Sequence, residues 1–477
     1  MITMKKITIL SLMISLFATT ACNDEYLNTE PSEFISAPEA QYIVNGMYTM
    51  MVNDGTGGTT DHDDFGQKGY DIYSDLLSSD MVLGGVTYGW YSNIANLSDP
   101  INFTRNTNYK PWRYYYRLIT TANDVIAKLG GNDAIPPSDE NRHAMGQAKA
   151  LRAYAYFYLL QFYTNKYDAS ADSIPLYTEA GTNPAPLSKQ SEVYDLIIND
   201  LSTAITLLND FSRTNKGMIN KFVAEGLLTY AYAAKGDYAN VATHASNIIN
   251  TSGYPITSSQ EALGGFNDLS SPSWMWGFDI TLDNGLDLIS WWGQVDIFTY
   301  SYSWAGDPKA IDENLYNSIR TDDIRKEQFA GSYEGVDLLP TNKFYHPNRE
   351  IGGQRLIETD YIFMRVDEFH LLYAEALAKT AQVGLAKTTL KNYLQTRIAD
   401  VSYIDGMNQT QLEEEIYKNT RIEFWGEGKS YLALKRNRAT VTRGDNHLFF
   451  QGQNIPYDDD RIKLSIPQDE VINNPHF

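Results

Sequence analysis

The sequence predicts a mainly α-helical fold that carries one long irregular segment. Apolar residues recur at helical spacing through most of the chain, most clearly in residues 139–163 and 191–208. Residues 253–360 differ, because they are rich in Gly, Ser, Asp, Trp and Tyr and show little helical periodicity. With 477 residues, of which 43% are hydrophobic and 20% charged, the chain can bury the core of one large or two ordinary domains.

The first 22 residues have the layout of an export signal. They contain Lys5 and Lys6, continue through an apolar run at residues 7–17 and end with small residues before Cys22. We therefore expect residues 1–21 to be a signal peptide. The apolar run is too short for a membrane-spanning helix, which takes about 20 residues. Cys22 is the only cysteine, so no intrachain disulfide forms, and it is either a lipidation site or an incidental free thiol.

The chain after the signal begins with a polar stretch and then becomes mostly helical. Residues 38–51 are expected to form the first helix, with Ser36 as its N-cap and Pro38 in its first turn. Residues 53–68 are rich in Gly, Asp and Thr and predict a loop. The tail after residue 442 contains several prolines and is expected to be irregular. The remaining helices are expected at residues 112–129, 139–163, 191–208, 221–235, 238–250, 366–380, 385–399 and 411–434.

Two pairs of these helices are expected to form hairpins. Leu228, Tyr232 and the turn at residues 236–238 match the pattern of a tetratricopeptide helix pair. Residues 366–399 are expected to form a second hairpin, which turns at Gly384. The chain shows no clean repeat of fixed length, so these pairs predict degenerate repeats rather than an open solenoid.

The charge of the chain excludes one class of partner. There are 59 acidic residues against 38 basic ones, which gives a net charge of −21. A field of this sign repels phosphate backbones, so nucleic acid is not an expected partner. Tyr outnumbers Phe by 34 to 19. Because Tyr joins an apolar ring to a polar tip, this excess indicates wet aromatic surfaces as well as a core.

Several short segments together resemble one protein family. The lone cysteine is followed by acidic residues, one helix reads GQAKALRAYAYF, and two later segments read RVDEF and RIEFWGEG. These segments begin at residues 22, 146, 365 and 421, and the tail at residues 466–475 is also similar. Over nearly all of residues 22–477 the chain resembles the SusD/RagB family of surface lipoproteins of Bacteroidetes.

The resemblance implies a tetratricopeptide-like helical scaffold with an irregular, loop-rich ligand-binding face. It divides the chain into an N-terminal region at residues 22–250, a loop-rich aromatic region at 253–360 and a C-terminal region at 361–477. It also implies a non-catalytic, surface-exposed lipoprotein of the outer membrane, anchored through a lipid on Cys22. Such a protein would capture an oligosaccharide or polysaccharide and deliver it to a SusC-like TonB-dependent transporter.

Aromatic residues in the irregular segments are the expected ligand contacts. The apolar C–H face of a sugar stacks on an aromatic ring, whose face carries negative quadrupole density. Five of the eight tryptophans lie between residues 274 and 304. The expected glycan-contacting residues are Trp90, Tyr91, Trp274, Trp276, Trp291, Trp292, Tyr302 and Trp304.

Two expectations about burial accompany this site prediction. Trp291 and Trp292 are neighbours that point in different directions, so we expect one of them to be buried and the other exposed. Trp112 and Trp425 lie in expected helices and are assigned to the core. The alternative that about half of the clustered tryptophans fill a second core beneath the loops stays open.

No motif predicts a catalytic centre, a metal site or a cofactor. The seven histidines lie apart from one another, which disfavours zinc. Gly426 to Ser430 imitate the end of a phosphate-binding loop, but position 423 is Glu rather than the required Gly. Residues 61–64 and 458–460 could offer carboxylates to calcium, although we expect solvated acidic loops there.

Two other functions stay open at this point. The first is a peptide-capturing lid, since some members of the family are similar to peptide binders. The second is a secreted glycoside hydrolase on a helical scaffold, which would need two carboxylates about 5–10 Å apart. The chain has many carboxylates, of which residues 413–415 are expected to form a charged helix face.

Overall fold

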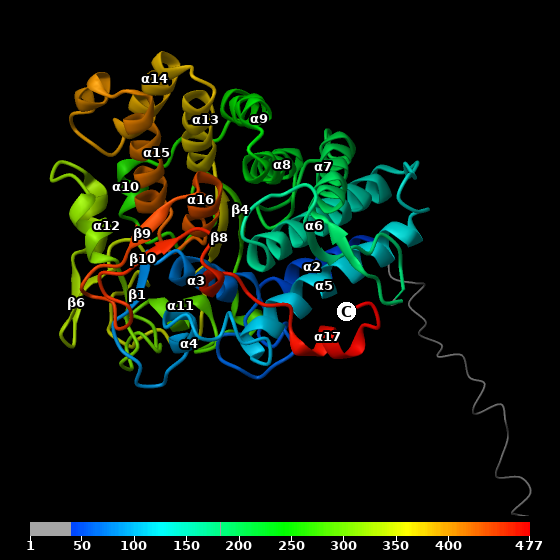
Figure 1. Ribbon diagram of the computed structural model, residues 1–477, viewed down its shortest axis with the longest axis horizontal. Helices are drawn as coiled ribbons and strands as arrows, with labels where there is room; N and C mark the ends of the chain where they lie inside the picture. Colours follow the sequence, from blue (N-terminus) through cyan, green and yellow to red (C-terminus); the bar gives the residue numbers. More distant parts are fainter. Residues whose placement is uncertain (1–39, 182) are drawn as a thin grey trace, which may run out of the picture.

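The computed structural model describes residues 40–181 and 183–477 (Figure 1). The predicted signal peptide, Ser36 and the predicted lipidation site Cys22 lie outside the described residues. The described part of the chain is mainly helical, as predicted, and its strands form two-stranded antiparallel sheets.

The N-terminal helices pack side by side in sequence order. α5 packs on α6, α6 on α7, α7 on α8 and α8 on α9, which places successive helices next to each other on one side of the molecule (Figure 1). α6 occupies the predicted range because Ser138 caps its first turn and accepts a hydrogen bond from the Asn141 N–H. The helices of this part are α2 (Ala40–Met50), α5 (Asn106–Lys128), α6 (Asp139–Tyr163), α7 (Gln190–Leu207), α8 (Lys221–Lys235) and α9 (Tyr238–Thr251).

The second helical hairpin joins α13 (Asp367–Lys379) to α14 (Val383–Leu394). The predicted turn at Gly384 is wrong, because Gly384 lies inside α14. The chain instead turns at Ala381, which adopts a left-handed conformation with φ of 61°. With α15 this hairpin encloses a second, smaller hydrophobic core.

The single helix predicted at residues 411–434 is two helices, α15 (Gln409–Glu423) and α16 (Ser430–Asn437). Gly426 and Gly428 between them have φ of +80° and +71°, which breaks the helix. A Cβ atom on Gly426 would lie 2.5 Å from the ring of Phe344, so the close approach of that ring also requires glycine.

Short elements punctuate the irregular region and the segments beside it. The strand β4 (Trp274–Phe278) pairs with β8 (Tyr361–Arg365), and β1 (Met81–Leu83) pairs with β5 (Lys309–Ile311). The other pairs are β2 (Asp172–Pro175) with β3 (Leu187–Lys189), β6 (Gly331–Tyr333) with β7 (Val336–Leu339), and β9 (Thr440–Thr442) with β10 (Asn454–Pro456). The short helices are α3 (Gln67–Leu77), α4 (Ser92–Ala95), α10 (Ser259–Ala262), α11 (Trp291–Val295), α12 (Glu313–Ser318) and α17 (Gln468–Asn473). Single 3-10 turns occur at Leu282–Asn284, Ile324–Phe329, Ser402–Gly406 and Asp460–Ile462.

A buried ion network ties the irregular region to the C-terminal helices. Glu423 at the end of α15 accepts hydrogen bonds from Arg365 (2.7 Å), Arg397 (3.1 Å) and Arg325 (3.1 Å). All four side chains are at most 2% exposed. The network is electrically balanced, because four cations face four anions. They are Arg325, Arg365, Arg397 and Lys343, opposite Asp323, Asp367, Glu423 and Glu427.

Within the described residues, no helix combines the length and the apolar character that crossing a bilayer requires.

Candidate functional site

Three loops meet at the end of the molecule that carries α4 and α11 (Figure 1). Asp307 accepts hydrogen bonds from the backbone N–H groups of Tyr88 (3.1 Å) and Gly89 (3.0 Å). The Tyr300 N–H donates to the Gln354 carbonyl at 2.7 Å. Segments near residues 88, 304 and 354, which lie far apart in the sequence, are therefore fastened together.

A fourth loop, residues 53–64, brings a histidine to the same place. Asp64 holds this loop in shape, because its carboxylate accepts hydrogen bonds from the N–H groups of Gly57 (2.7 Å) and Thr59 (3.0 Å). Burial raises the pKa of the Asp64 carboxyl, and these hydrogen bonds oppose that rise. Lys110 of α5 forms ion pairs with the carboxylates of Asp61 and Asp63.

His62, at the tip of this loop, lies against Trp90. The two rings are stacked with their centroids 5.0 Å apart and their planes 5° apart. The Tyr302 hydroxyl forms a short hydrogen bond with Nδ1 of His62. Tyr302 also contacts Tyr88 edge-on, with the ring centroids 5.2 Å apart. The buried Tyr302 ring therefore supports three aromatic side chains that reach further outward.

Trp304 forms a second aromatic group on the same segment. Its ring lies 5.2 Å from that of Tyr300, and the Arg355 guanidinium lies 4.4 Å from the Tyr300 ring centroid. Gly352 packs on Trp304 so closely that a Cβ atom there would lie 2.9 Å from the indole. We call the solvent-facing set His62, Tyr88, Trp90, Tyr300 and Trp304 the aromatic surface.

The structure brings only part of the predicted site to the surface. Trp90 and Trp304 are partly exposed, and Tyr88 beside Trp90 is 59% exposed. The other predicted contacts are at most 5% exposed, so their burial contradicts the prediction that they stack on a glycan. These residues are Tyr91, Trp274, Trp276, Trp291, Trp292 and Tyr302.

The positions of the buried tryptophans explain this correction. Trp274 and Trp276 lie on β4 rather than in a loop, and strand pairing with β8 turns them into the core. Trp276 packs edge-on against Tyr154 of α6, and its Nε1–H donates to the Gly217 carbonyl at 3.0 Å. Four of the five clustered tryptophans are therefore buried, and they belong to the main hydrophobic core shared with the helices rather than to a second core beneath the loops.

The prediction that only one of Trp291 and Trp292 is buried is wrong. Both lie in the short helix α11, and their rings contact each other edge-on with the centroids 5.0 Å apart. Both are buried because both rings pack on Phe344. Trp112 and Trp425 are buried, which confirms their assignment to the core.

The acidic stretches considered for calcium are engaged with protein partners. Beside the contacts of residues 61–64 described above, Asp459 pairs with Arg461 and Asp460 pairs with Lys463. Among the described residues, no group of three or more His, Cys, Asp or Glu side chains is arranged to hold a metal ion.

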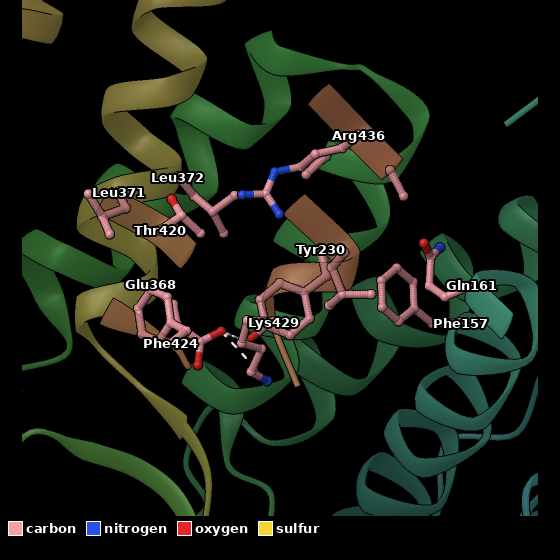
Figure 2. A pocket seen from close by; sticks show the side chains of 13 residues that line it. Phe157, Gln161, Tyr230, Glu368, Leu371, Leu372, Thr420, Phe424, Lys429 and Arg436 are labelled. Carbon is pink, nitrogen blue, oxygen red and sulfur yellow. Dashed lines mark hydrogen bonds and ion pairs between the residues drawn. The ribbon is translucent and has the colours of Figure 1, made fainter. Parts of the chain in front are cut away.

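A buried acid lines a small, partly open cavity, which Figure 2 shows. Glu368 accepts a hydrogen bond from the Tyr230 hydroxyl, and its carboxylate lies 3.7 Å from the Lys429 ammonium. Burial raises the pKa of the Glu368 carboxyl, which is a feature of some catalytic acids. However, the cavity has a volume of about 30 Å³, far below the roughly 300–1,000 Å³ of ligand pockets, and Glu368 is the one carboxylate in its lining. This cavity therefore lacks both the second acid and the space that glycoside hydrolysis needs.

Two family models match different parts of the chain. Residues 26–235 match a model described as starch-binding associating with outer membrane, and residues 292–475 match the model of the SusD family. The chain belongs to the SusD/RagB family. Two of the segments that suggested this family meet in the structure, since the motifs that contain Arg365 and Glu423 form part of the buried ion network.

Curated relatives within the SusD family are distant and are matched in part. A SusD-like protein of Bacteroides ovatus is 27% identical over 32% of this chain and 29% of its own length. A SusD-like protein of Formosa agariphila is 24% identical over 57% of this chain and 50% of its own length. The chain thus spans at most about half the length of these relatives.

Solved SusD structures share the fold over almost the whole chain. A SusD-like carbohydrate binding protein from Bacteroides vulgatus superposes with a TM-score of 0.79 at 24% identity, covering 92% of this chain and 96% of its own. The surface glycan-binding protein A of Bacteroides thetaiotaomicron, solved with laminarihexaose, gives a TM-score of 0.67 at 17% identity, covering 92% and 97%.

Sequence reasoning missed His62 and Arg355, which lie at the candidate site. His62 lies between aspartates, and the stretch at residues 61–64 was therefore considered only as an acidic loop that could bind a cation. Its role depends on contacts with Trp90 and Tyr302, which are distant in the sequence. The proximity of Arg355 to the Tyr300 ring likewise has no local sequence signal.

Proposed function

We propose that this protein binds carbohydrate on the aromatic surface and does not cleave it. The observation that carries the proposal is the partly exposed pair Trp90 and Trp304, held on loops that are hydrogen-bonded to each other. Indole faces stack on the C–H faces of sugar rings, and Arg355 and His62 supply donors to sugar hydroxyls nearby. The family membership and the laminarihexaose-bound neighbour support this ligand class.

The exposed apolar side chains around these rings favour an extended ligand. Val86, Tyr88, Ile351 and Leu356 lie on the same loops and are 44–61% exposed. An open face of this kind binds in the millimolar to micromolar range, roughly −4 to −8 kcal/mol. Many copies meeting one polymer gain avidity without new contacts, so weak single-site affinity suits capture followed by release.

The proposal extends to the cellular role. The protein would be anchored by a lipid on Cys22 at the outside of the outer membrane and would pass glycan to a SusC-like TonB-dependent transporter. Two acyl chains or more are required for stable anchoring, which a lipoprotein modification supplies. Cys22→Ala should release the protein from the membrane fraction, whereas retention of this variant in that fraction would exclude the anchor.

The binding test uses Trp90→Ala and Trp304→Ala with a matched aromatic control. Tyr42→Ala is suitable, because Tyr42 is 63% exposed on α2 and is not part of the aromatic surface. A glycan and peptide array first identifies the ligand, and isothermal titration calorimetry then gives affinities. We expect each tryptophan variant to lose about tenfold in affinity, equivalent to about 1.4 kcal/mol, and the Tyr42 variant to bind normally.

Three outcomes would contradict parts of the proposal. Normal affinity in folded Trp90→Ala and Trp304→Ala proteins would exclude the aromatic surface as the site. Binding of peptides but not glycans on the array would favour the peptide-capturing alternative. New reducing ends after incubation with the bound glycan would show that the protein is a hydrolase.

A further inference from the structure

A basic pocket lies where four helices end, apart from the aromatic surface. The C-terminal ends of α6, α8, α13 and α16 surround a space of about 390 Å³. None of the residues that line it is an aspartate or a glutamate. Six cationic side chains line it: Lys166, Lys235, Lys379, Lys435, Arg436 and Arg438. This concentration of positive charge is unexpected in a chain with a net charge of −21.

Structural roles account for only part of this charge. Arg436 forms an ion pair with Glu375 at 2.9 Å, and Lys379 forms one with Glu413 at 2.6 Å. Lys435 donates to carbonyl groups at the end of α6, as cations commonly do at helix C-termini. These three side chains would be present without any ligand.

The other three cations are poorly neutralised. Lys235 lies 3.9 Å from the exposed Asp195. Within the described residues, the Lys166 and Arg438 side chains form no hydrogen bond or ion pair. The pKa of the Asp168 carboxyl is lowered, mainly by hydrogen bonds from Ser170 and to a smaller extent by the nearby Lys166 ammonium. Two exposed cations therefore face the pocket with free donors.

Lys435 lies beside these cations and has no carboxylate partner. Its side chain is buried, and burial, together with the nearby Lys463, lowers the pKa of its ammonium to about 7. Its hydrogen bonds go to the carbonyl oxygens of Gln161 and Thr164 and not to a carboxylate. An anion in the pocket would reduce the electrostatic cost of charging Lys435.

The walls and the size of the pocket favour an organic anion over an inorganic one. Tyr167, Tyr194 and Tyr238 line it, and the Lys235 ammonium lies 5.4 Å from the Tyr167 ring centroid. A space of about 390 Å³ falls within the usual range of ligand pockets, about 300–1,000 Å³. A free sulfate would leave most of the pocket unfilled, whereas a sugar ring would fill it and contact the tyrosines.

We propose that this pocket binds an acidic sugar, meaning a saccharide unit that carries a carboxylate or a sulfate ester. Lys166, Lys235 and Arg438 hold the anionic group, and the tyrosines contact the ring. The pocket shares no residue with the aromatic surface, so this binding is independent of the function proposed for that surface.

The test compares two double variants of the full chain that carry the same change in charge. Lys166→Gln with Arg438→Gln removes the two free cations of the pocket. Lys387→Gln with Lys391→Gln removes two cations from α14, outside the pocket. Isothermal titration calorimetry at low salt uses trigalacturonate, a chondroitin sulfate disaccharide, sodium sulfate and neutral maltotriose as probes, and circular dichroism checks folding.

We expect the wild-type protein and the α14 variant to bind at least one of the two acidic sugars. The pocket variant should bind that sugar at least tenfold more weakly, and binding should weaken as salt is added. Equal affinity in the two variants, or no binding of either acidic sugar to the wild type, would overturn the proposal. Binding of sulfate without either sugar would show a small-anion site and exclude a sugar site. If the wild type is retained on phosphatidylglycerol vesicles, the pocket variant is not, and the wild type binds neither acidic sugar, the pocket binds a lipid surface instead.

Discussion

Glu423→Gln tests whether the buried ion network holds the irregular region on the helical scaffold. The substitution keeps the shape of the side chain but removes one of four negative charges that balance four buried cations. Three guanidinium groups within 3.1 Å of Glu423 then share an uncompensated positive charge. Removing one partner from a buried ion pair costs about 3–5 kcal/mol.

The cost converts into a measurable shift in melting temperature. The unfolding entropy is about 2.1 cal/mol/K per residue, so the whole chain gives roughly 1 kcal/mol/K. A loss of 3–5 kcal/mol then lowers the Tm by about 3–5 °C, measured by circular dichroism. The control is Glu413→Gln, because Glu413 pairs with Lys379 at a site where both side chains are 22% exposed. Such a partly exposed pair contributes about 0–1 kcal/mol to stability, so the Tm of Glu413→Gln should differ from the wild-type Tm by at most about 1 °C. Equal shifts in the two variants would refute the reasoning.

The same network predicts a dependence of stability on acid. Burial alone would raise the pKa of Glu423, but the guanidinium groups, Arg397 first, lower it well below its usual range. A carboxyl whose pKa is lower in the folded protein stabilises the fold above its unfolded pKa, about 4.3, and this contribution is lost as pH falls. Between pH 5 and pH 3 the Tm of the wild type should therefore fall further than that of Glu423→Gln.

Two further predictions concern buried residues of the segment that also carries Trp304. Trp276→Ala should lower the free energy of unfolding by about 3–5 kcal/mol, because it leaves a cavity at a buried site. At temperatures where the variant is folded, its glycan affinity should stay within twofold of the wild-type value. A tenfold loss of affinity in the folded variant would place Trp276 in the binding site. Burial raises the pKa of Asp296 in the folded protein to about 7. As pH rises from about 4 to 7, this carboxyl ionises in the unfolded chain but stays protonated in the folded protein, so the wild type should lose stability over this range. Asp296→Asn should flatten this dependence in thermal melts, and an unchanged slope would show that Asp296 is ionised in the folded protein throughout this range.

Helices were predictable where their signals are local. α6 and α8 have the predicted bounds, because each begins at a capping side chain and carries apolar residues at helical spacing. The break between α15 and α16 was missed, although Gly426 and Gly428 were visible in the sequence. Their left-handed backbone and the close approach of Phe344 depend on tertiary packing, which outweighs the helical pattern on either side.

The candidate site was predictable as a region but not residue by residue. Whether a tryptophan stacks on a sugar or fills a core depends on partners such as Tyr154, which lies about 120 residues before Trp276 in the chain. The composition of residues 274–278 does not show whether they form a buried strand or a loop, because their partner strand β8 lies far along the chain at residues 361–365. The same long-range pairing explains why His62 and Arg355 could not be identified beforehand.

The contacts beneath the aromatic surface bear on how it binds. Asp307, Asp64 and Lys110 fasten the loops that carry Trp90 and His62, and each does so through hydrogen bonds or ion pairs within the protein itself. A preformed surface loses little loop entropy on binding, so most of the interaction free energy of the rings is available as affinity. Loosening the loop should therefore weaken binding even where no ring is removed. Lys110→Met removes the ion pairs with Asp61 and Asp63, and we expect weaker glycan binding from this variant, although Lys110 is buried and lies outside the aromatic surface.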